Sequence, residues 1–265
     1  MSILLREIRA GRNSWLAWTV SLCFLTFLIV WIYPAVARSS EAFIQYVDSL
    51  PPQLTAAFGL DRISFADPVG FFGIEAYSLI LLFGSIYTAL LGATILVKEE
   101  SEKTAEFLLA KPLSRAAIVS QKAAAVLVYV ALFNLAVTVV SLVSFRLFVE
   151  QSYRIGTIIQ LMAGSFFCTL TFAAIGLLLS SALRRVRTAY TLALGGVLAT
   201  YFLSIFSELS DKLEWVKYLT PFRYVEAADI MTSGLSPTSV ALLLGVTAAS
   251  TGAAYLVYGR KDIHV

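Results

Sequence analysis

The sequence predicts an all-α membrane protein with six transmembrane helices. Of its 265 residues, 58% are hydrophobic and only 14% are charged, whereas soluble domains carry about 25% charged residues. Its apolar residues gather in six segments, each near the ~20 residues that a helix needs to cross a bilayer. Mean hydropathy is accordingly high, at +0.81. We expect residues 1–265 to form a single transmembrane domain.

The amino-terminal segment predicts a short interfacial helix followed by the first span. Residues 3–12 carry apolar side chains on one side and three arginines elsewhere, which suits a helix lying among lipid headgroups. The first span is expected at residues 14–36, too long for the core of a cleavable signal. The other spans are expected at residues 73–97, 123–145, 157–183, 188–206 and 236–258. Short outer helices are expected between the fifth and sixth spans.

Cation counts predict the orientation of the chain. With both termini inside, the inner segments hold 13 of the 20 lysines and arginines, and the outer segments hold 11 of the 17 acids. Positively charged loops remain in the cytoplasm. We therefore expect a multi-pass protein with both termini in the cytoplasm.

The longest charged run, residues 98–122, separates the second and third spans. It contains five cations and four acids, and a charge at the centre of a bilayer costs ~2.5–3.5 kcal/mol. Pro112 ends one helix near Ala110, and Ser114 can cap a second helix. We expect a helical elbow outside the bilayer that serves as a docking surface. The alternative is a solvated loop that only sets the topology.

Several kinds of chemistry have no residues to support them. The only histidine, His264, is the penultimate residue, so we expect no catalytic triad, haem or histidine metal site within the spans. Glycine precedes none of the seven lysines, so the sequence lacks a P-loop. No basic and aromatic stripe suggests nucleic acid. We expect no catalytic, cofactor-binding or metal-binding residue in this chain.

Small and polar residues within the spans predict helix contacts. Gly84, Thr88 and Gly92 recur at every fourth position of the second span, and Gly245 and Ala249 do so in the sixth. Such stripes let helices approach closely in lipid, either within the chain or between subunits. Asn134, a polar residue within the third span, is expected to form a hydrogen bond between helices.

The charged run resembles the cytoplasmic segment of ABC-2 type permeases. That segment has acidic residues, a Thr-x-Glu-x-Leu-Leu core, a Pro-hydrophobic-Ser-Arg motif and a lysine opening the third span. The matching residues are Glu99, Glu100, Thr104, Glu106, Leu108, Leu109, Pro112, Leu113, Ser114, Arg115 and Lys122. The usual glycine before the threonine is Lys103 here. LTPFRY at residues 219–224 and the basic-Asp ending at 260–262 extend the resemblance along the chain.

The resemblance implies a permease subunit of an ATP-driven ABC exporter in the plasma membrane. Its expected partners are ABC-type ATPase subunits, a second permease (identical or related) and membrane lipids, with ATP and Mg bound by the ATPase. In that family the elbow is a coupling helix seated in a groove of the ATPase. The expected docking residues are Glu99, Glu100, Glu102, Thr104, Glu106, Phe107, Leu108, Leu109, Pro112 and Arg115.

The resemblance also places the second and fifth spans beside the translocation path. Their residues there would be Phe83, Tyr87, Tyr190, Leu194 and Phe202, with no charge. We therefore expect a hydrophobic or amphipathic cargo, such as a peptide antibiotic, a lipid or a hydrophobic drug. Packing explains the same residues about as well.

Two other functions stay open at this point. The same elbow would serve a non-transporting membrane anchor or regulator that docks an ABC-type ATPase. A polytopic membrane enzyme is disfavoured because the spans hold no cluster of acids, histidines or nucleophiles, and only a catalytic arrangement of the outer-loop acids Glu208, Asp211 and Glu214 could revive that interpretation. We expect those acids to form a solvated face.

Overall fold

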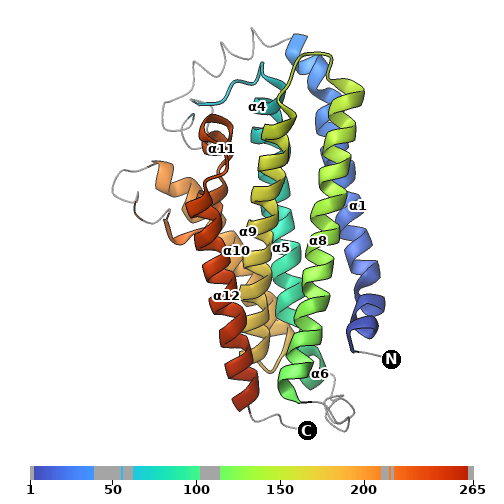
Figure 1. The fold of residues 1–265 in the computed structure, drawn as a ribbon, viewed down its shortest axis with the longest axis vertical. Coiled ribbons are helices and arrows are strands. Elements are labelled where there is room, and N and C mark those ends of the chain that lie inside the picture. Colours follow the sequence, from blue (N-terminus) through green and yellow to red (C-terminus); the bar gives the residue numbers. More distant parts are fainter. Residues whose placement is uncertain are drawn as a thin grey trace.

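Six long helices form an elongated bundle in the computed structural model, which describes residues 3–38, 55, 62–101, 114–209, 215 and 218–261 (Figure 1). No strand occurs among these residues, and six helical stretches are long and apolar enough to cross a membrane. The all-α prediction with six spans is therefore confirmed. The spans are α1 (Ile3–Arg38), Pro68–Ile95, α8 (Arg115–Phe148), α9 (Ile155–Ala182), α10 (Val186–Leu209) and α12 (Pro237–Arg260).

The first helix is longer than predicted. Residues 3–12 do not form a separate interfacial helix but are the first turns of the continuous helix α1. Two contacts with α8 hold them upright: the Tyr129 hydroxyl donates a hydrogen bond to the Ile8 carbonyl, and Gly11 lies directly against the Tyr129 ring. A Cβ atom at Gly11 would lie 2.9 Å from that ring. Glycine therefore lets the two helices meet where a side chain would separate them.

The second span consists of three helical segments in one line. It begins with α4 (Pro68–Phe72), continues through a π-helical turn, η1 (Gly73–Tyr77), and ends with α5 (Ser78–Ile95). The span starts five residues before the predicted position because Asp67 caps α4, its Oδ2 accepting a hydrogen bond from the Gly70 amide at 2.8 Å. The short helix α6 (Val97–Ser101) follows α5 almost without a break.

The third span begins at the predicted cap. Ser114 Oγ accepts a hydrogen bond from the Ala117 amide at 3.1 Å, which satisfies one of the free donors at a helix start. From there α8 runs unbroken to Phe148, so the second helix of the elbow and the third span are one helix. The remainder of the predicted coupling helix, residues 102–113, lies outside the described residues.

The core of the bundle is the contact between α5 and α9. About 67% of the membrane window of each of these spans is buried, against 17–22% for α1, α10 and α12. Glycines allow the close contact, since a Cβ atom at Gly92 would lie 2.1 Å from the Ala173 carbonyl oxygen, and one at Gly176 would lie 2.3 Å from that of Ala89. The glycine stripe predicted in the second span therefore serves packing within the chain.

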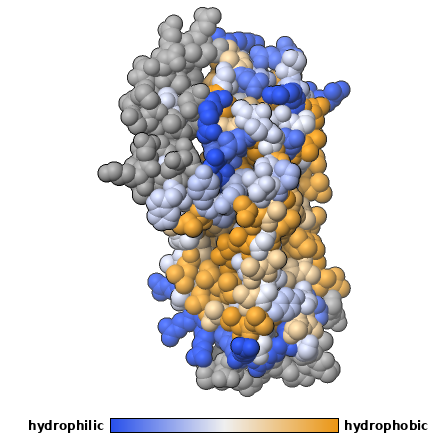
Figure 2. Space-filling model, turned by 60° about the vertical axis from the view of Figure 1, so that its left-hand side comes forward, coloured by the Kyte–Doolittle hydropathy of each residue, from blue (hydrophilic) through white to orange (hydrophobic). Residues whose placement is uncertain are grey.

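The other spans surround this pair. Helix α10 packs on α5, α12 packs on α9, and α8 lies between α9 and α1. The Asn134 side chain of α8 bonds to α9, donating to Thr169 Oγ1 at 3.0 Å and accepting from Ser165 Oγ at 3.1 Å, so the predicted bond between helices is confirmed. Figure 2 shows the outer surface of this arrangement, a hydrophobic zone between hydrophilic ends.

Two short helices join the fifth and sixth spans, as predicted. They are the 3-10 helix η3 (Pro221–Val225) and α11 (Ala227–Ser233). Tyr77 secures them to the core, because its buried hydroxyl donates to the Val225 carbonyl at 2.9 Å. They lie at the same end of the bundle as α4, whereas α6 and both termini lie at the opposite end (Figure 1).

Candidate functional site

The predicted docking elbow is described at its two flanks. Glu99 and Glu100 lie on α6, and Arg115 is the first residue of α8. All three form contacts within the chain, as set out below. The other predicted docking residues lie outside the described residues: Glu102, Thr104, Glu106, Phe107, Leu108, Leu109 and Pro112.

Glu99 is buried against a fully buried lysine. Its two carboxylate oxygens each accept a hydrogen bond from Lys122 Nζ at 2.6 Å, and one also accepts from Arg6 Nη2 at 2.7 Å. Only 5% of Glu99 is exposed. A buried charge is tolerated only when it is paired and hydrogen-bonded, and these contacts meet that requirement.

A second buried acid completes the group. Glu7 of α1 is 2% exposed and lies 3.3 Å from Lys122 Nζ, and it also forms an ion pair with Lys98 of α6. We name these five side chains the inner charge cluster: Arg6, Glu7, Lys98, Glu99 and Lys122. It carries three cations and two acids from α1, α6 and α8, so ionic contacts join both flanks of the elbow to the first helix.

The same flanks are also tied to the last helix. Lys261, just beyond α12, lies 2.7 Å from Glu100. The Arg115 guanidinium donates to the carbonyls of Tyr258, Gly259 and Lys261, the last at 2.6 Å. Carbonyls at a helix end lack partners within the helix, so Arg115 caps α12. The described flanks of the elbow therefore contact both α1 and α12.

Sequence reasoning missed most of these contacts. Arg6 and Glu7 were assigned to an interfacial helix, and Lys122 appeared only as part of a motif. One signal was present: Lys122 is a lone cation followed directly by the apolar run AAAVLV. A charge placed there needs an acid nearby, but the sequence does not show that the acids come from residues 7 and 99.

The predicted path residues divide into separate locations. Tyr87 of α5 and Tyr190 of α10 line one cavity of about 210 Å³, together with Trp18, Glu7 and Lys98. This cavity opens beside the inner charge cluster, so charge lies next to the predicted path, where none was expected.

The other three path residues do not join that cavity. Phe83 lines a different hollow of about 410 Å³ against α1. Leu194 packs on the core, and Phe202 is 51% exposed next to Tyr201 and Phe206. The structure thus places Tyr87 and Tyr190 on one cavity, and the other three path residues do not line it.

At the opposite end of the bundle a second group of charges is paired. Arg62 and Arg223 each contact both Glu226 and Asp229. These pairs connect the segment before the second span to the helices before the sixth. Glu208 has no described side chain, and Asp211 and Glu214 lie outside the described residues.

Comparison with known proteins gives one family. The family model described as "ABC-2 family transporter protein" matches residues 1–263. No curated protein matches the sequence. Because the match extends over nearly the whole chain and the fold has six spans, the chain belongs to the ABC-2 transporter family and is a membrane permease subunit of an ABC transporter, not the ATPase.

Proposed function

We propose that this protein is the permease subunit of an ATP-driven exporter, with ATPases supplied in trans that dock at the elbow. The observation that supports this most is the pairing of both elbow flanks with distant helix ends. Lys98 on one flank and Lys122 beyond the other both pair with Glu7 of α1, and Glu99 pairs with Arg6 of α1. A loop that only set the topology would not need a buried ionic connection.

The proposed mechanism transmits force through rigid helices. ATP and Mg²⁺ are bound by the partner ATPases, whose closure displaces residues 102–113. The inner charge cluster passes that displacement to α1, and Glu100 and Arg115 pass it to α12. Helices move as units because their backbone groups must stay hydrogen-bonded in lipid.

The proposed assembly contains a second permease, identical or related, in the plasma membrane with the elbow and both termini in the cytoplasm. Helices α1 and α10 each leave most of their surface uncovered within the chain, so they can contact both lipid and a second subunit. The cavity of Tyr87 and Tyr190 opens between these two helices and α5. Its apolar walls and charged inner end suit an amphipathic cargo.

A site-specific photo-crosslinker at Glu106 tests the docking proposal. The full chain is expressed in cells that contain its ATPase partner, and the crosslinked products are identified by mass spectrometry. We expect Glu106 to crosslink to an ATP-hydrolysing polypeptide, while a control crosslinker at the exposed residue Ser152, at the other end of the bundle, does not. Absence of such a product at Glu106, or equal products at both positions, would overturn the docking role.

A charge reversal at Glu106 and an export assay distinguish the exporter from the anchor or regulator. Glu106→Lys should lower cargo export by tenfold or more while the chain still inserts and the ATPase still hydrolyses ATP. Export is measured with vesicles and a panel of apolar and amphipathic compounds. ATPase binding without export of any compound, in the unmodified protein, would favour the anchor or regulator instead.

A further inference from the structure

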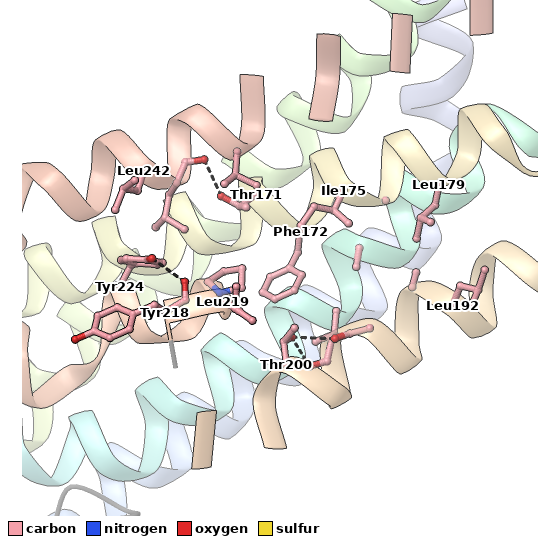
Figure 3. Close-up of a pocket in the computed structure, with 18 residues that line it drawn as sticks. Thr171, Phe172, Ile175, Leu179, Leu192, Thr200, Tyr218, Leu219, Tyr224 and Leu242 are labelled. Carbon is pink, nitrogen blue, oxygen red and sulfur yellow. Dashed lines mark hydrogen bonds between the residues drawn. The ribbon is translucent and has the colours of Figure 1, made fainter. Parts of the chain in front are cut away.

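Another cavity lies between α9, α10 and α12, away from the elbow and from the cavity of Tyr87 and Tyr190. Its volume is about 270 Å³, and Tyr218, Leu219 and Tyr224 line one end of it (Figure 3). It shares no lining residue with the cavity of Tyr87 and Tyr190. Its walls include Phe172 and Ile175 of α9, Leu192 and Gly196 of α10, and Leu242 and Val246 of α12.

The hydroxyl groups in this wall are already used. Thr171 Oγ1 lies 3.1 Å from Thr247 Oγ1 and donates to the Phe167 and Leu243 carbonyls. Thr200 Oγ1 donates to its own helix, and the Tyr224 hydroxyl donates to the Tyr218 carbonyl at 2.7 Å (Figure 3). An occupant would find apolar surface with these hydroxyls already engaged, so the chemistry favours a hydrocarbon.

The dimensions fit a single chain. From Phe172 to Leu179 the wall extends along α9 for about 10 Å, at 1.5 Å per residue. A wall of this length and a volume of about 270 Å³ leave room for one extended alkyl chain.

The mouth of the cavity opens toward the bilayer. Leu192, Leu242 and Val246 on its rim are 49%, 47% and 44% exposed, and they belong to the two spans with the least burial. The cavity lining also includes the exposed Tyr218 and Leu219, and tyrosine is typical of the membrane interface. The mouth of the cavity thus extends from the depth of the lipid headgroups to the hydrocarbon region, as the acyl chain of a lipid does.

We infer that this cavity binds one acyl chain of a membrane phospholipid, from the leaflet next to η3. The chain fills the space between α10 and α12 and supports α10 against α5. Lipid surroundings are as apolar as the cavity, so binding gains little from leaving water. What favours it is close packing, since a void this large would leave its lining without contacts.

Adjacent glycines on α10 supply a matched pair of variants. A Cβ atom at Gly196 or at Gly195 would meet no heavy atom within 4 Å, and only Gly196 lines the cavity. Gly196→Phe fills the cavity, and Gly195→Phe places the same ring outside it. The purified full chain is reconstituted in phosphatidylcholine vesicles that contain a phospholipid with a diazirine in its acyl chain, and labelled residues are mapped by mass spectrometry.

The expected result is labelling of α9 and α12 residues on the cavity wall, reduced at least tenfold by Gly196→Phe and unchanged by Gly195→Phe. A second measurement needs no variant: moving the diazirine from a shallow to a deep carbon should move labelling from Leu219 toward Leu179. Uniform labelling of all lipid-facing residues would overturn the inference. A second probe, decane that carries a diazirine, gives another contradicting outcome. If it labels the wall and excess phospholipid does not reduce that labelling, the site takes a small apolar compound and the inference is wrong. None of these outcomes depends on an ATPase partner.

Discussion

At Lys122, an ammonium group with no solvent exposure lies among two carboxylates and a backbone carbonyl. A buried pair of this kind contributes little net stability when compared with apolar residues, but removal of one partner is costly because a charge is left unpaired. The cluster is therefore best understood as specifying which helices meet.

This argument predicts the effect of removing the lysine. Lys122→Met should destabilise the protein by about 3–5 kcal/mol, because Glu99 and Glu7 lose their shared buried cation. The full chain is heated in detergent, and size-exclusion chromatography then measures the fraction that stays folded at each temperature. The shift of the unfolding midpoint reports the change in stability. Arg184→Met, which removes an exposed charge, is the control and should change stability by less than ~0.5 kcal/mol.

A double variant tests the reason for the effect. When Glu99→Gln is added to Lys122→Met, the combined loss should be smaller than the sum of the two single losses, since the unpaired carboxylate is gone. Strictly additive losses would show that the two side chains act independently, contrary to the structure.

Among the elements, the contact between α5 and α9 has the strictest geometric requirement. Gly92 and Gly176 each lie against a carbonyl of the opposite helix, where backbone rather than a flexible side chain blocks any added atom. In α12, by contrast, Gly245 and Gly252 have no atom within 4 Å of an added Cβ. Glycine stripes of similar appearance therefore have different roles in these two helices.

This difference predicts unequal responses to the same substitution. Gly92→Val should cost 1–3 kcal/mol or more from overpacking, because α5 and α9 must separate. Gly245→Val should not destabilise the protein, because an added Cβ there meets no atom and valine has a slightly higher helix propensity than glycine. Thermal stability in detergent and the yield of folded protein measure each variant. Equal losses would contradict the close approach that the structure places at Gly92.

For the whole molecule, the two ends of the bundle predict a labelling pattern. Ser152, between α8 and α9, and Arg184, between α9 and α10, are both exposed and lie at the two ends of α9. With the natural cysteines Cys23 and Cys168 replaced by alanine, a membrane-impermeant maleimide should label Ser152→Cys in intact cells. Arg184→Cys should be labelled only after permeabilisation.

Each position is the other's control in this experiment. The reverse pattern would place the elbow outside the cell and remove any access to cytoplasmic ATP. Such a result would contradict the proposed docking but leave the phospholipid site unaffected, because the leaflet next to η3 supplies the chain whichever side of the membrane it faces.

Much of this protein could be predicted from its residues. The six spans, the Ser114 cap, a hydrogen bond from Asn134 to another helix and the short helices after the fifth span all followed from local properties: hydropathy over about 20 residues, capping chemistry and the cost of an unpaired polar group in lipid. Such signals need no knowledge of which helices are neighbours, and the family match over residues 1–263 agrees with them.

Only the tertiary structure decided which distant residues meet. The inner charge cluster joins residues 6–7, 98–99 and 122, and the phospholipid cavity is built from α9, α10 and α12. The first turns of α1, residues 3–12, belong to the same helix as the first span because they contact Tyr129 and Lys122 of α8. Their composition alone suits a helix at the membrane interface. The physical reason is that hydropathy specifies that a helix crosses the bilayer, while the pairing of helices depends on close packing and on paired buried charges that no single segment contains.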